Sequence, residues 1–143
     1  MKKLLTLLFI TSTAYAQPTL SLNLNPHRAG LDLGYEYKAI HVLAGYNTPL
    51  MSATRPTLLF ASVGYVIGVN NPVSFTPSIG YAKTTALSFN NEGNSEVTKE
   101  KGMYYNAEIG YNKHMGRLFI AATHTGSLTF GSVGIRVFFV KRR

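Results

Sequence analysis

Apolar side chains recur at every second position along most of this chain, in eight segments separated by turn residues. The segments run over 20–24, 31–37, 40–46, 59–67, 73–81, 103–111, 118–122 and 133–139. A repeat of two is the period of a β-strand with one apolar face. Turn residues fill the breaks, as in Asn25-Pro26, Asn70-Asn71-Pro72 and His124-Thr125-Gly126. The pattern predicts one all-β domain of eight antiparallel strands.

The connections between these segments differ in length. Short turns are expected at 38–39, 69–72 and 112–116, and longer polar loops at 47–56 and 83–102. With an even number of strands, both chain ends and the short turns fall at one end of the sheet, and the long loops fall at the other. Pro77 lies inside the fifth segment. Because proline cannot donate a ladder hydrogen bond, we expect that strand to be irregular there.

The residues between the apolar ones decide which face of each strand meets water. A soluble barrel needs a charged outer face, whereas a membrane barrel turns its apolar face to lipid. Here the second face is small, rich in glycine and nearly uncharged, as in Ser62, Gly64, Ser74 and Gly80. Only 14% of all residues are charged, against about a quarter in soluble domains. These features favour an eight-stranded antiparallel transmembrane β-barrel, an up-and-down meander. The alternative is a soluble secreted lipocalin-like barrel that binds an apolar ligand.

Residues 1–16 have the pattern of a secretory signal peptide. Two lysines follow the initiator methionine, 4–10 is an apolar run, and Ala14 and Ala16 are the small residues that signal peptidase requires. The run is far shorter than the ~20 residues of a membrane-spanning helix. We therefore expect export through the Sec pathway, cleavage after Ala16, and a barrel domain over 17–143.

The dipeptide Gly-Tyr occurs five times, each time toward the end of a strand segment. In an alternating strand the glycine then faces the lumen and the tyrosine faces lipid. Strand ends lie at both membrane surfaces, where amphipathic aromatic rings are favourable. The predicted aromatic girdle consists of Tyr35, Tyr37, Tyr46, Tyr65, Tyr81, Tyr111 and Phe139.

With its signal peptide, eight alternating segments, short turns and aromatic last strand, the chain resembles the small eight-stranded outer-membrane β-barrels, the OmpA/OmpX-like class. The resemblance covers Gln17 to Phe139. It implies a protein of the Gram-negative cell outer membrane, surrounded by membrane lipids and lipopolysaccharide. It also implies insertion by the barrel-assembly machinery, which would recognise an assembly signal made of Gly134, Arg136, Phe138 and Phe139. The chain departs from the class because Val140-Lys141-Arg142-Arg143 follows the aromatic pair. We expect a monomer.

Four charged residues fall on the predicted lumen face, namely Asp32, Glu36, Glu108 and Arg136. An eight-stranded barrel is just wide enough for side chains to fill it, so an unpaired charge inside would be costly. We expect Arg136 to reach Asp32, Glu36 or Glu108. The prediction is an interior charge network that fills the lumen as a structural plug.

The remaining charges fall at the two rims. The expected inner rim is basic without acidic partners, and consists of Lys38, Lys113, Arg117, Lys141, Arg142 and Arg143. The outer rim is mixed, with Arg28, Arg55, Lys83, Lys99 and Lys101 beside Glu92, Glu96 and Glu100. A basic inner rim suits anionic headgroups. Because the cations form no single stripe among exposed aromatics, no nucleic-acid partner is predicted.

Some small outer-membrane barrels are lipid A-modifying hydrolases, and three residues define that alternative here. His124 and Ser127 are three apart in the last outer connection, and His27 lies in the first. A histidine beside a serine is the arrangement for nucleophilic catalysis. The His-Ser-Asn-like motif of the lipid A deacylases is absent, however. We therefore predict no catalysis, no cofactor and no metal, and a structural or surface-interaction role.

Overall fold

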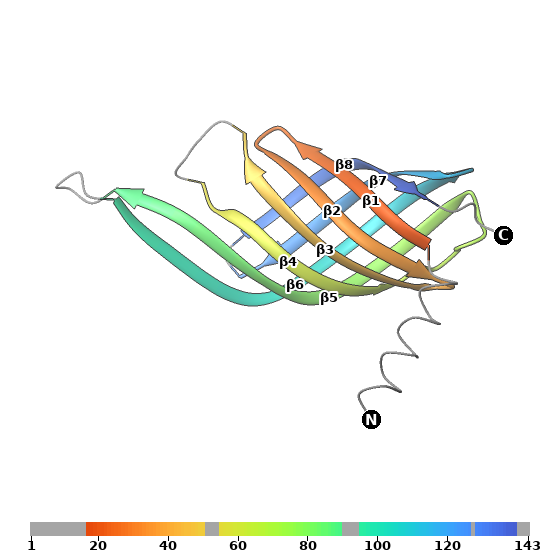
Figure 1. Cartoon of the computed structure of the whole chain (residues 1–143), viewed down its shortest axis with the longest axis horizontal. Coiled ribbons are helices and arrows are strands. Elements are labelled where there is room, and N and C mark those ends of the chain that lie inside the picture. Colours follow the sequence, from red (N-terminus) through yellow and green to blue (C-terminus); the bar gives the residue numbers. More distant parts are fainter. Residues whose placement is uncertain (1–16, 51–54, 90–94, 127, 140–143) are drawn as a thin grey trace, which may run out of the picture.

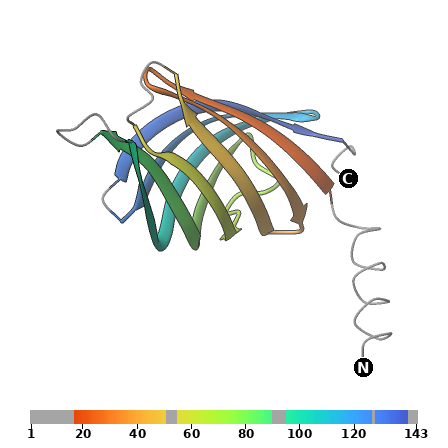
Figure 2. The same cartoon turned by 60° about the vertical axis from the view of Figure 1, so that its left-hand side comes forward.

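The computed structural model describes residues 17–50, 55–89, 95–126 and 128–139. Its strands, in chain order, are β1 Gln17–Asn25, β2 Arg28–Tyr37, β3 Ile40–Pro49, β4 Thr57–Tyr65, β5 Val73–Phe89, β6 Ser95–Lys113, β7 Gly116–Thr125 and β8 Leu128–Phe138. Each strand pairs antiparallel with the next, and β8 pairs with β1, so the sheet closes into a barrel (Figure 1; Figure 2). The predicted fold class is confirmed. Within the described ranges, no helix is long and apolar enough to cross a membrane.

The barrel has two different ends. Gln17 and Phe139 lie at one of them, together with the β2–β3, β4–β5 and β6–β7 turns, and we call it the terminal end (Figure 1). The other four connections lie at the opposite, loop end. The predicted signal peptide with its cleavage site after Ala16 lies outside the described residues, as do Glu92, Ser127 and the tail 140–143.

Alternation along the strands separates an apolar outer wall from a polar lumen. In β1, Leu22 and Leu24 are exposed on the outer wall, whereas Ser21 and Asn23 are buried inside. Six of the strands have 9–11 residues, which is the length of ~9–11 that a tilted strand needs to cross a bilayer. The sheet is thus the right height for a membrane and has its apolar face outward.

The β5–β6 hairpin is longer than the rest of the barrel wall. The two strands have 17 and 19 residues and remain paired as far as Phe89 and Ser95. Pairing with β4 already ends at Thr85, and pairing with β7 ends at Tyr104. The hairpin, coloured green to teal in Figure 1, therefore projects beyond the loop end.

The prediction of a polar loop over 83–102 is wrong, because most of that stretch belongs to β5 and β6. The composition suggested a loop, since the apolar repeat stops there. Both faces of a projecting hairpin lie outside the barrel wall and the lumen, so its residues are not required to alternate between apolar and polar. Its β-branched residues, such as Thr84, Thr85, Val97 and Thr98, still favour an extended backbone.

Pro77 does not interrupt its own strand. β5 runs through Pro77, which lies opposite Ala107 of β6. The irregularity falls on the side of β5 that faces β4, where the β4–β5 ladder ends at Gly64 and Ser78. A proline has no N–H to donate, and the ladder with β4 stops beside it.

Two glycines inside the lumen make room for phenylalanine rings on the neighbouring strands. Gly45 is paired with Phe60, and a Cβ at Gly45 would lie 2.6 Å from the Cζ of that ring. Gly134 is paired with Phe119, whose ring covers it, and a Cβ there would also meet the carbonyl oxygen of Leu22. Large rings over glycines fill much of the narrow interior.

Candidate functional site

The centre of the lumen holds a buried, two-pronged ion pair. The Arg136 guanidinium donates from Nη1 to Oε1 of Glu108 at 2.7 Å and from Nη2 to Oε2 at 2.9 Å. Its Nε donates to the Ser21 hydroxyl at 2.8 Å. Both charged side chains are almost completely buried. Two parallel bonds between an arginine and a carboxylate are among the stronger protein contacts. Of the three expected partners, Glu108 is the one that pairs with Arg136.

Arg117 is a second lumen arginine, and its predicted position at the inner rim is wrong. Its side chain is completely buried, with Nη2 lying 3.2 Å from Oε2 of Glu36 and Nη1 lying 3.6 Å from Oε1 of Glu108. Its Nε donates to Oδ1 of Asn112 at 2.7 Å. The physical reason is alternation in β7, where Leu118 faces outward and Arg117 therefore faces inward. Arg117 joins Glu36 and Glu108, so the network is continuous from Glu36 to Arg136.

Asp32 lies on the loop-end side of this network. Its Oδ2 accepts a hydrogen bond of 2.7 Å from Nδ2 of Asn23, and Oδ1 has no hydrogen-bond partner among the described residues. At the other end of the network, His41 is buried and lies opposite Glu36 in the β2–β3 ladder. Among the described residues, the middle of the lumen therefore contains three carboxylates and two guanidinium groups as one polar column.

Aromatic side chains close this column at both ends. Phe138 is buried at the terminal end, with the guanidinium of Arg117 5.3 Å from its ring centre. At the loop end, the rings of Phe60 and Tyr104 stack with centroids 4.4 Å apart. Arg28, expected at the outer rim, is instead buried in the loop-end mouth, where it lies over Phe130 and donates to the carbonyl of Pro56 at 2.8 Å. The lumen is filled along its length.

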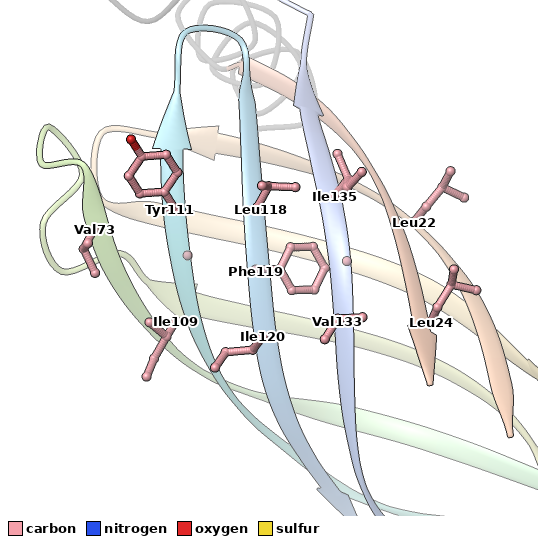
Figure 3. Close-up of a pocket in the computed structure, with 12 residues that line it drawn as sticks. Leu22, Leu24, Val73, Ile109, Tyr111, Leu118, Phe119, Ile120, Val133 and Ile135 are labelled. Carbon is pink, nitrogen blue, oxygen red and sulfur yellow. The ribbon is translucent and has the colours of Figure 1, made fainter. Parts of the chain in front are cut away.

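The cavity inside the lumen and a groove on the outer wall differ greatly in size, which bears on ligand binding. The lumen cavity between Asp32, Asn47 and Arg136 has about 20 Å³ of space, enough for about one water molecule. A much larger groove of about 630 Å³ lies on the outer wall, lined by apolar side chains such as Leu118 and Ile135 (Figure 3). The described residues thus offer an apolar ligand no room inside, contrary to the lipocalin-like alternative.

The seven aromatic residues of the predicted girdle all lie on the outer wall. Their exposed fractions are 50% for Tyr35, 39% for Tyr37, 47% for Tyr46, 58% for Tyr65, 54% for Tyr81, 53% for Tyr111 and 57% for Phe139. Tyr46 and Tyr81 lie on strands that run toward the loop end, and the other five lie near the terminal end of their strands. Tyr105, next to His124 in the β6–β7 ladder, also faces outward and was missed.

The histidine of the hydrolase alternative is held by a neutral partner. Nδ1 of His124 lies 2.7 Å from the hydroxyl of Thr129, and its ring is stacked 6.3 Å from that of Tyr105 on the outer wall. A base in a catalytic triad is oriented by an acid instead. His27 is in the first turn, where its backbone N–H donates to Oδ1 of Asn25 at 2.8 Å. Ser127 lies outside the described residues.

Metal binding has no support in the described part of the chain, where no three histidine, aspartate or glutamate side chains are grouped to hold an ion.

The residues of the predicted assembly signal divide between the two faces of β8. Gly134, Arg136 and Phe138 face the lumen, and Phe139 follows on the outer wall.

Comparison with known proteins identifies the fold and leaves the family open. No protein-family model and no curated protein matches this chain. The N-terminal β-barrel domain of Pseudomonas aeruginosa OprF aligns over 87% of this chain and 96% of its own, with TM-score 0.65 and 12% identity. Yersinia pestis outer-membrane protein Ail aligns over 87% and 99%, with TM-score 0.56 and 16% identity. A de novo designed transmembrane β-barrel aligns over 86% and 93%, with TM-score 0.55 and 14% identity. The chain has the fold of the small eight-stranded outer-membrane barrels.

Proposed function

We propose that this chain is an integral outer-membrane protein with a closed lumen and a structural or surface-interaction role. The observation that carries the proposal is the inverted distribution of side chains. Leu33 and Ile120, at mid-height on the outer wall, are 60% and 57% exposed, while Arg117 and Arg136 are fully buried. In water, a continuous apolar wall around the molecule would cause association. In a bilayer, the same wall contacts the lipid acyl chains, which are as apolar as the side chains themselves.

The proposed orientation places the terminal end in the periplasm and the loop end outside the cell. The long connections of such barrels are extracellular and the short ones periplasmic. In this orientation the girdle lies at both interfaces, and β8 carries the signal for the barrel-assembly machinery. Residues 1–16 would direct export and be removed after Ala16. We infer a monomer surrounded by phospholipid and lipopolysaccharide.

Membrane insertion has a direct test. The purified chain should fold to β-structure only with detergent or lipid, and the folded form should run faster on a gel than the boiled form. In cells, it should fractionate with the outer membrane and have a mature N-terminus at Gln17. A monodisperse folded protein in plain buffer would refute membrane insertion.

A closed lumen and the absence of catalysis are tested separately. The filled lumen predicts no large, stable open channel in planar bilayers, and such a channel would refute the plug. Because His124 is bound to a threonine hydroxyl and not to an acid, we infer no lipid A-modifying activity. Mass spectra of lipid A from cells with and without the gene should therefore be the same.

A further inference from the structure

The projecting β5–β6 hairpin has two faces with different charges. Tyr81 and Met103 are paired on the outer wall, and the next outward-facing positions are Lys83 and Lys101, followed by Lys99. Glu96 and Glu100 occupy the alternate positions of β6 and belong to the opposite face. We call Lys83, Lys99 and Lys101 the lysine face. Alternation thus places three positive charges on the continuation of the lipid-facing wall, and separates them from the hairpin's described acids.

The three amino groups of the lysine face repel one another, and a bound anion would reduce this repulsion. Lys83 and Lys101 are direct cross-strand partners, so their Cβ atoms are about 5 Å apart, where like charges destabilise a sheet. Lys99 lies two residues from Lys101 on the same face and adds to the repulsion. Among the described residues, none of the three forms an ion pair. A phosphate near the three amino groups would remove the repulsion.

The height of the lysine face matches the headgroups of the outer leaflet. Lys83 lies two residues beyond Tyr81, which is part of the loop-end girdle. Two residues along a strand tilted by about 40° raise a side chain by about 5 Å. The lysine stems can then pack along apolar wall while the amino groups reach the polar layer. The cross-strand neighbour of Lys83 on β4 is the exposed Leu59.

We propose that the lysine face binds the phosphate groups of a phosphorylated glycolipid, lipid A, in the outer leaflet. The inference rests on the proposed membrane insertion and names the partner of the hairpin. A phosphate carries between one and two negative charges at neutral pH and three acceptor oxygens, which suits three clustered ammonium groups. The acyl chains of the same molecule would lie against the apolar wall below, beside Leu59 and Tyr81.

The test measures binding of bisphosphorylated lipid A to the full chain folded in zwitterionic detergent, with bound lipid counted by native mass spectrometry. A lysine at an anionic surface contributes roughly fivefold in affinity. K83Q/K101Q should therefore bind about 25-fold more weakly, and adding K99Q should weaken binding further. K38Q/K113Q removes two lysines at the terminal end, Lys38 in the β2–β3 turn and Lys113 as the last residue of β6, and should change affinity less than about threefold.

Three outcomes would overturn the proposal. One is unchanged affinity of K83Q/K101Q while its folded form still shifts on a gel. Another is equal binding of lipid A from which both phosphates have been removed. A third is tighter binding of a soluble sulfated polysaccharide that displaces lipid A, which would assign the lysine face to a soluble polyanion. Failure of the wild-type chain to fold in detergent would instead refute membrane insertion, so the two failures are distinguishable.

Discussion

The substitution Arg136→Met tests whether the central ion pair stabilises the barrel. Methionine retains much of the side-chain length but removes both hydrogen bonds to Glu108 and the bond to Ser21. Removing one partner of a buried ion pair costs about 3–5 kcal/mol, because the other charge stays buried. Here Glu108 keeps Arg117, with Nη1 3.6 Å from Oε1. We therefore expect the lower value, about 3 kcal/mol.

The assay for Arg136→Met is equilibrium urea unfolding of the protein in detergent micelles, followed by the gel shift of the folded form. Small proteins lose about 1–3 kcal/mol of stability per molar urea. A loss of about 3 kcal/mol thus lowers the unfolding midpoint by roughly 1–3 M. Lys113→Met is the control, because its side chain is exposed at the terminal end and should change stability by less than about 0.5 kcal/mol.

A midpoint for Arg136→Met equal to that of Lys113→Met would refute the plug. A double variant separates the cause of any loss. Adding Glu108→Leu removes the stranded carboxylate, so part of the lost stability should return. If the double variant is less stable than Arg136→Met, lost packing and not the unpaired charge explains the effect.

Three further predictions concern the walls of the barrel. Gly134→Ala should lower the free energy of unfolding by about 1–3 kcal/mol through overpacking, because a Cβ there meets Phe119. Gly131→Ala is the control in the same urea assay and should be neutral, because the nearest atom to a Cβ there is 3.7 Å away. Leu33→Arg, in the middle of the lipid-facing side of β2, should cost about 2–4 kcal/mol in a bilayer, and a neutral effect would contradict the proposed lipid contact. His124→Ala should leave the mass spectrum of cellular lipid A unchanged, and a lipid A species lost with the variant would reveal catalysis.

The repeat of two was sufficient to predict the strands that cross the membrane. Each of these strands has lipid on one side and a packed lumen on the other, so its sequence alternates. The projecting hairpin lacks this apolar alternation, because Lys99 and Glu100 occupy opposite faces that both lie beyond the apolar wall. Residues of β6 still alternate between the two faces there, but the alternation is between positive and negative side chains. A search for apolar residues at every second position cannot detect it.

The interior network was only partly predictable, because its members come from strands far apart in the sequence. The sequence places Asp32, Glu36, Glu108 and Arg136 on the inner face by alternation alone. Which carboxylate Arg136 reaches depends on how the strands are staggered around the closed barrel. Arg117 was missed because it follows a turn, although the outward Leu118 is a local signal that Arg117 faces inward.

The ion pairs also bear on how the barrel closes. Ser21 lies opposite Arg136 in the ladder between β1 and β8, and Leu22 lies opposite Ile135. If β8 changed faces relative to its neighbours, as it would in a register shifted by one residue, Arg136 and Phe138 would exchange places with Ile135 and Val137. Glu108 would then be left facing an apolar lumen and an arginine would enter lipid, at a cost of several kcal/mol. Apolar contacts do not strongly oppose a shift by two residues, because such a shift keeps every side chain on its own face and lipid solvates leucine and isoleucine equally well at many positions. The same shift would still move Arg136 away from Glu108. The buried pair is therefore better placed than the apolar wall to select one closing register, and Arg136→Met should increase misassembled barrels as well as lower the stability of the correct one.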